Sequence, residues 1–137
     1  MTVLDRDWQA VAGATETAIL ELRKAAPCDL PGSYLALLRE TNGGEGPLAR
    51  QPLYVQLDSA ETVTLAASSK RHEEYFSGFL MIGSNGGGEF IALDMRKTGT
   101  LPIVAIDMTN IDLDESVSHI APDFDSFIEL IGIDKSS

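Results

Sequence analysis

Two glycine-rich runs, one in each half of the chain, constrain the fold more than any other feature of the sequence. The first is Asn42-Gly43-Gly44, and the second is Ser84-Asn85-Gly86-Gly87-Gly88. Glycine adopts left-handed backbone conformations without the steric cost that a Cβ brings, so runs of this kind mark sharp turns. We therefore expect the chain to change direction at residues 42–44 and again at residues 84–88.

The first run follows a segment that has the marks of a helix. Pro31 stands at its start, where proline suits the first turn. Tyr34, Leu37 and Leu38 then recur at helical spacing, which predicts that they form the buried face. Residues 31–41 are thus predicted to be a short helix, and Gly43 or Gly44 to supply the left-handed residue that closes it.

The second run separates two apolar segments and is typical of a β-hairpin. Residues 79–82, 90–93 and 102–106 are predicted strands, and their spacing indicates an antiparallel meander. The stretch Gly83–Gly88 also has the spacing of a phosphate loop, but Glu89 and Phe90 stand where Lys and Ser or Thr are required. A structural turn is the favoured interpretation, and a nucleotide or other small ligand in this loop is the alternative.

Hydrophobic periodicity predicts the remaining elements of the chain. The predictions are a helix or turn at 4–12, helices at 15–26, 60–76 and 122–131, a loop at 45–52 and a strand at 53–57. The 137 residues match the usual length of one domain, roughly 100–150 residues. We expect a single α+β domain over residues 1–137, in which helices pack on a mostly antiparallel sheet.

Composition limits the classes of function. No window approaches the run of about 18 apolar residues that a membrane helix needs, and the N-terminus lacks the pattern of a secretion signal. Cys28 is the only cysteine, which excludes an internal disulfide and fits a cytoplasmic protein. His72 and His119 do not belong to a metal-binding pattern, so neither a metal nor a cofactor is expected.

Acidic residues are concentrated in the last third of the chain. Within the net charge of −11, the stretch from Val104 to Asp134 has eight acidic residues and no lysine or arginine. Such a surface repels nucleic acid and anionic lipid and attracts a basic protein, although it could equally serve solubility alone. The residues predicted to form the partner-binding face are Asp107, Asp112, Asp114, Glu115, Asp123 and Asp125.

The order of these motifs resembles the SUKH superfamily, which includes the Smi/Knr type of fungal cell-wall-synthesis regulator and many bacterial immunity proteins. The resemblance covers about residues 15–131 and leaves residues 1–14 without a role. It rests on Leu30, Pro31, Tyr34, Leu37, Leu38, Asn42, Gly43 and Gly44, on the hairpin at 80–94 and on the closing helix at 124–128.

The resemblance implies an α+β fold and a protein that acts by binding, because the family pattern contains no catalytic residues. We expect a non-enzymatic protein-binding module, in first place an immunity protein that neutralises a cognate basic toxin. A regulatory scaffold of the cell-wall type is the alternative.

Overall fold

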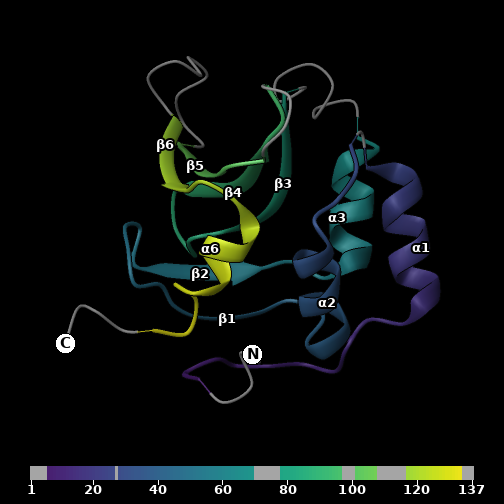
Figure 1. Cartoon of the computed structure of the whole chain (residues 1–137), viewed down its shortest axis with the longest axis horizontal. Helices are drawn as coiled ribbons and strands as arrows, with labels where there is room; N and C mark the ends of the chain where they lie inside the picture. Colours follow the sequence, from purple (N-terminus) through teal and green to yellow (C-terminus); the bar gives the residue numbers. More distant parts are fainter. Residues whose placement is uncertain (1–5, 27, 70–77, 97–100, 108–116, 134–137) are drawn as a thin grey trace.

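A six-stranded antiparallel sheet forms the centre of the protein (Figure 1). The computed structural model describes residues 6–26, 28–69, 78–96, 101–107 and 117–133. The strands follow one another across the sheet in sequence order: β1 (Gly44–Pro47), β2 (Tyr54–Leu57), β3 (Phe79–Ser84), β4 (Glu89–Asp94), β5 (Ile103–Asp107) and β6 (Val117–Ala121). The predicted meander is confirmed, and β6 adds a strand that periodicity did not predict.

The helices of the described residues lie against this sheet in two pairs. They are α1 (Glu16–Ala25), α2 (Gly32–Glu40), α3 (Ala60–Ala67) and α6 (Phe124–Ile128). In Figure 1, α1 lies beside α3, and α6 lies across the sheet next to α2. Thr15 and Ser59 cap α1 and α3 by accepting hydrogen bonds from the amides of Ala18 and Thr62, respectively. The predicted α+β class is confirmed.

Two predicted helices differ from the structure in their length. The helix predicted at 60–76 ends at Ala67, and residues 70–76 of that prediction lie outside the described part. The helix predicted at 122–131 is shorter at both ends, because Asp123 is its N-cap and the chain turns after Ile128. Ile131, which periodicity placed on the helix, instead forms an antiparallel bridge with Leu48 and is fully buried.

The sheet is buried on both faces along its central strands. On β3, Leu80 and Ile82 belong to the main core under the helices, whereas Phe79 and Met81 belong to a second apolar cluster. Successive side chains of a strand point to opposite faces, so the two clusters lie on opposite sides of the sheet. This explains why the middle strands appear in the sequence as continuous apolar runs.

The N-terminal segment, residues 6–14, forms no helix and pairs with β1 at Gln9, so the helix predicted at 4–12 is wrong for residues 6–12; residues 4 and 5 lie outside the described part. Gln9 and Glu45 exchange backbone hydrogen bonds of 2.8 and 3.3 Å, which extends the sheet at its β1 edge. Trp8 is 8% exposed, and its Nε1 donates to the carbonyl of Gly43 at 3.3 Å. The loop predicted at 45–52 is also wrong at its start, because β1 is paired on both sides.

The glycines at 43 and 44 do not close α2, contrary to the prediction. Thr41 ends the helix in an extended conformation, with φ −147° and ψ 121°. Gly43 and Gly44 do have positive φ, +96° and +109°, but they lie beyond the cap at the start of β1. A Cβ on Gly44 would lie 2.6 Å from Nε1 of Trp8, so this glycine is needed because the N-terminal segment approaches so closely.

Candidate partner-binding face

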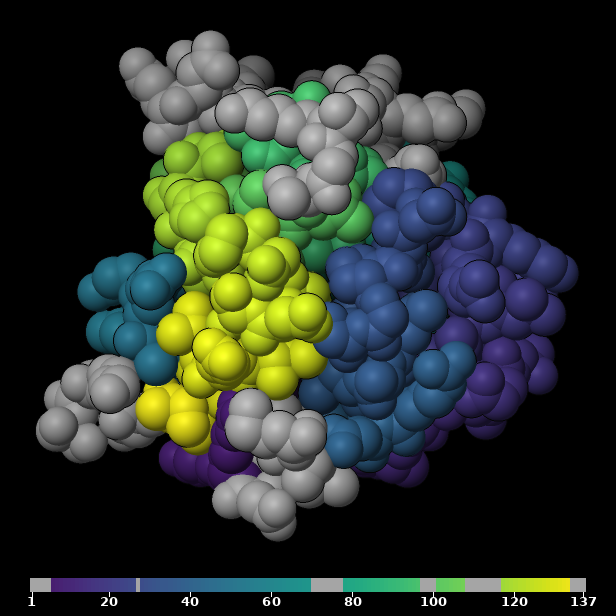
Figure 2. Space-filling model, viewed as in Figure 1, coloured from purple at the N-terminus to yellow at the C-terminus, as the bar shows by residue number. Residues whose placement is uncertain are grey.

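Helix α6 is held against α2 by aromatic packing. Phe124 and Phe127 are buried, and the Phe124 ring packs edge-on against Tyr34 with the ring centres 5.0 Å apart. Within the described residues the hydroxyl of Tyr34 has no hydrogen-bond partner, and burial raises its pKa, so it stays protonated. Figure 2 shows α6 (yellow) and α2 (blue) side by side on one face of the molecule. Asp123, Asp125 and Glu129 are exposed on this face.

A pocket of about 490 Å³, which we call the α2–α6 pocket, lies where these two helices begin. Its lining residues are Asp29, Pro31, Gly32, Ser33, Leu101, Asp123, Phe124 and Asp125. Three carboxylates from two separate parts of the chain therefore share one pocket. Among the described lining residues there is no lysine or arginine, so the pocket is suited to a cationic group.

The carboxylate of Asp123 is held in its ionised form. Its Oδ1 accepts a hydrogen bond of 2.7 Å from the amide of Ser126, and this bond lowers the pKa of Asp123 below its ordinary value. No cluster of three or more His, Cys, Asp or Glu side chains suited to a metal ion occurs in the described ranges. The pocket therefore presents fixed negative charge without the geometry of a metal site.

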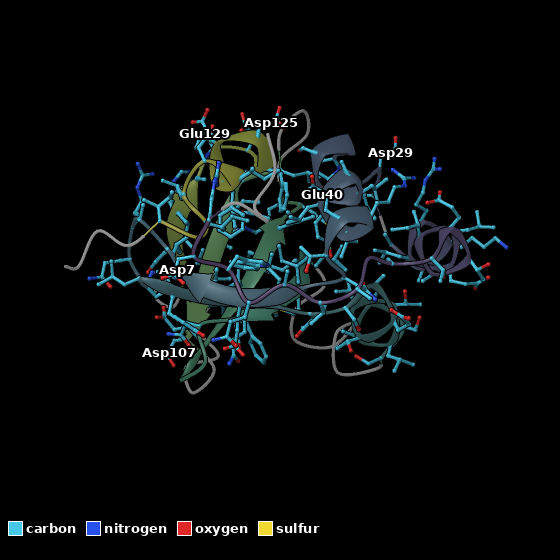
Figure 3. All side chains as sticks on the ribbon, turned by 90° about the horizontal axis from the view of Figure 1, so that it is seen from below. Asp7, Asp29, Glu40, Asp107, Asp125 and Glu129 are labelled. Carbon is cyan, nitrogen blue, oxygen red and sulfur yellow. The ribbon has the colours of Figure 1, made fainter. Side chains whose placement is uncertain are left out.

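The structure divides the residues predicted from the acidic stretch. Asp123 and Asp125 lie together at the α2–α6 pocket. Asp107, at the end of β5, projects from the opposite side of the molecule to Asp125 (Figure 3). Asp112, Asp114 and Glu115 lie outside the described residues. Proximity in the sequence therefore does not place Asp107 on the same surface as Asp123 and Asp125.

The sequence analysis missed Asp29, which the fold brings to Asp123 and Asp125 from about a hundred residues away. Asp29, Asp125 and Glu129 project on the same side in Figure 3. The sequence did contain a partial signal, because Asp29 directly precedes the Leu30-Pro31 motif that begins α2. We define the acidic face as Asp29, Asp123, Asp125 and Glu129.

The glycine-rich loop at 84–88 is a hairpin turn between β3 and β4, as predicted. Its backbone amides are largely bonded within the loop itself. Asn85 Oδ1 accepts from the amides of Gly87 and Glu89 at 2.8 and 3.2 Å, and Ser84 Oγ accepts from that of Gly86 at 3.2 Å. A phosphate would have to break these bonds, and no helix begins at the loop to add its dipole.

No helix within the described ranges is both long and apolar enough to cross a membrane. A search among curated proteins finds no match. A search against family models finds the SMI1/KNR4 family (SUKH-1), whose model matches residues 13–130 and hence most of the chain, including α1 to α6 and the whole sheet. This family supports an immunity-protein or SMI1/KNR4-like role in general terms, and with it interaction with other proteins. The chain belongs to the SMI1/KNR4 family (SUKH-1).

Proposed function

We propose that this protein is a non-enzymatic immunity protein of the cytoplasm that binds a cognate toxin through the acidic face. The observation that carries the proposal is the convergence of Asp29, Asp123 and Asp125 on one pocket whose lining, as far as it is described, contains no basic residue. A basic side chain of a toxin, for example in the nucleic-acid groove of a nuclease, would find several carboxylates there. Pairing across such a face speeds encounter and fixes orientation.

The rest of the fold suits a rigid binding surface. Phe124 and Phe127 anchor α6 in the main core, so the acidic side chains project from a fixed backbone. Arg6 bonds the carbonyls of Ile128 and Ile131 and holds the end of the same helix. A preformed face of this kind loses little conformational entropy on binding.

The test begins with the identification of the partner. The tagged protein captures interacting proteins from its source cells at low salt, mass spectrometry identifies them, and the pair is reconstituted from purified components. Association rates are then measured at low and at physiological salt for the wild type and for a variant with Asp29→Lys and Asp125→Lys. We expect association of this variant to be at least about tenfold slower, with the difference shrinking as salt rises.

Asp107→Lys is the control, because it makes the same kind of charge reversal on the opposite side of the molecule. It is compared with Asp125→Lys alone, which also reverses one charge. Asp107→Lys should leave the association rate close to that of the wild type. In cells, expression of the toxin should stop growth, the wild-type protein should restore it, and the variant at Asp29 and Asp125 should restore it poorly. If the captured partner is not toxic, the immunity role is wrong. If all variants associate with the partner at the wild-type rate, the acidic face is not the binding surface.

A further inference from the structure

A second cavity adjoins the acidic face, between α1 and α2. We call it the α1–α2 groove; its volume is about 580 Å³, within the range of roughly 300–1,000 Å³ that is typical of ligand pockets. Its lining residues are Leu20, Arg23, Lys24, Cys28, Asp29, Leu30 and Leu35. Asp29 lines both cavities, so the groove and the α2–α6 pocket are neighbours on the surface.

Part of the wall of the groove is apolar. Leu35 is part of the main core, and Leu30 packs against that core. Leu20 is 49% exposed, although its neighbour Ile19 on α1 is buried. The pKa of the Cys28 thiol is raised by burial and by the nearby charge of Asp29, so the thiol is neutral near pH 7. An aliphatic side chain placed here would bury apolar surface on both partners.

The rim of the groove carries positive charge that the described residues pair only weakly. Throughout the part of the chain that the structure describes, Arg23 has no ion pair or hydrogen bond of its side chain, whereas Arg39 and Arg96 each bind a carboxylate at 2.9 Å. Lys24 is 3.9 Å from Glu21, and both of these side chains are more than half exposed, so this pair is weak. Both cations suit the carboxyl end of α1, but the helix dipole does not account for the leucine-lined cavity beside them.

We propose that the α1–α2 groove binds an apolar side chain of the protein partner, with a carboxylate of that partner against Arg23 and Lys24. This proposal rests on the proposed function and adds the second half of the contact surface. The partner then carries a basic group for the α2–α6 pocket and an apolar–acidic pair for the groove, on either side of Asp29. Opposite charges at the two ends allow only one orientation of the partner.

A peptide titration tests the groove without knowledge of the partner. N-acetyl-leucyl-glutamyl amide is added to the ¹⁵N-labelled full-length protein, and amide shifts are followed by NMR. We expect saturable shifts at α1 and at the connector to α2, with a dissociation constant of ~1 mM or weaker. N-acetyl-leucyl-lysyl amide should bind about threefold more weakly, as for the loss of an exposed ion pair, and N-acetyl-seryl-glutamyl amide should bind more weakly still.

Two variants assign the roles of the groove residues. Arg23→Gln should remove the preference for glutamate over lysine, and Leu20→Ser should weaken both leucyl peptides. Leu65→Ser is the matched control, because Leu65 is 74% exposed on α3 and does not line the groove. Thermal unfolding verifies that each variant is folded. The proposal is wrong if the groove amides do not shift, if Arg23→Gln keeps the preference, or if decanoate binds there and the peptides do not.

The reconstituted complex separates this proposal from the proposed function. Leu20→Ser and Arg23→Gln should speed dissociation about tenfold together, whereas the variant at Asp29 and Asp125 mainly slows association. If the groove variants leave the dissociation rate unchanged, the groove proposal is wrong, and the proposal for the acidic face is unaffected. If the peptides bind at the groove but the variant at Asp29 and Asp125 associates with the partner as fast as the wild type, the proposed function is wrong and the groove proposal stands.

Discussion

The two glycine runs have the same pattern in the sequence and opposite environments in the structure. In each run an Asn directly precedes the glycines, and a Glu follows the last of them. In the first, Gly43 is buried, and a Cβ on Gly44 would fall 2.6 Å from both Trp8 Nε1 and the carbonyl of Gln9. In the second, Gly88 is exposed and has no atom within 4 Å of the position that its Cβ would take.

The comparison shows that a glycine run identifies a turn but not the reason for its glycines. The first run is required by packing, because the N-terminal segment and β2 both approach its backbone closely. The second run is required by backbone geometry at one residue, since Gly86 alone within it has a positive φ, +79°. Substitutions in the two runs should therefore differ in cost, and the following predictions test that difference.

The largest effect is expected for Gly44→Val. The side chain meets Trp8 and the Gln9 backbone, and the φ of +109° is unfavourable for a β-branched residue. Strain of about 1–2 kcal/mol from the backbone and about 1–3 kcal/mol from overpacking predicts a loss of about 2–5 kcal/mol in unfolding free energy. Urea unfolding measures it. Gly32→Ala, at a site with open space on α2, is the control and should change stability little.

A loss of similar size, about 3 kcal/mol, is expected for Trp8→Ala, because Trp8 is buried against the backbone of β1. If residue 44 must be glycine because Trp8 lies so close to it, then Gly44→Ala should lower the unfolding free energy by about 1 kcal/mol less in the Trp8→Ala background than in the wild type. The double-mutant cycle is measured by urea unfolding. Full additivity would show that the glycine serves the backbone conformation alone.

The sequence predicted the elements whose signals are local. The hairpin at 84–88, the strands β2 to β5 and the helices α1 and α2 follow from periodicity and turn residues over short windows. The end of the helix predicted at 122–131, after Ile128, was wrong because Ile131 pairs with Leu48, a contact that depends on the whole fold. Periodicity could not distinguish that buried bridge from another turn of helix.

Which acidic residues lie together on the surface could not be predicted from the sequence. The acidic face joins Asp29 to Asp123 across the fold, and the count of acids along the chain grouped Asp107 with them instead. The N-terminal segment was missed for a similar reason, because Gln9 pairs with Glu45 only after the sheet exists. Charge and pairing between distant segments are properties of the topology, which single-sequence patterns do not specify.

A smaller effect, about 1 kcal/mol, is expected for Gly86→Ala. The positive φ opposes any Cβ, but the nearest atoms, of Gln56, lie at 3.5 Å and make ordinary contact. Gly86→Asn should cost less than Gly86→Ala, because asparagine tolerates the left-handed region better. Chemical unfolding of both variants tests this ranking, and a cost equal to that of Gly44→Val would contradict the contrast between the runs.

Glu45, which follows the first run, should make the stability of the protein modestly dependent on pH. Hydrogen bonds from Tyr54 and Gln56 lower the pKa of Glu45. A carboxyl whose pKa is lower in the folded protein stabilises the fold above its unfolded pKa, and this contribution is lost as pH falls through the folded pKa. Tyr54→Phe should therefore raise the pKa of Glu45 toward its ordinary value and flatten the acid limb of the stability profile. NMR titration of Glu45 tests the shift, with Glu45→Gln as the assignment control.

The smallest effect is expected for Gly88→Ala. The site is open and its φ lies outside the left-handed region, so the change in unfolding free energy should stay within about 0.5 kcal/mol. A slight gain in stability is expected, because alanine restricts the unfolded chain more than glycine does.

The same variant also tests whether the second run binds a ligand, as its spacing first suggested. A nucleotide at 100 times its dissociation constant would stabilise the protein by about 2.7 kcal/mol, so millimolar MgATP should leave the unfolding midpoint of wild type and variant alike unchanged. A midpoint that rises with MgATP in the wild type and not in Gly88→Ala would show that the exposed run binds a ligand after all, and that the contrast with the packed run is one of function as well as of packing.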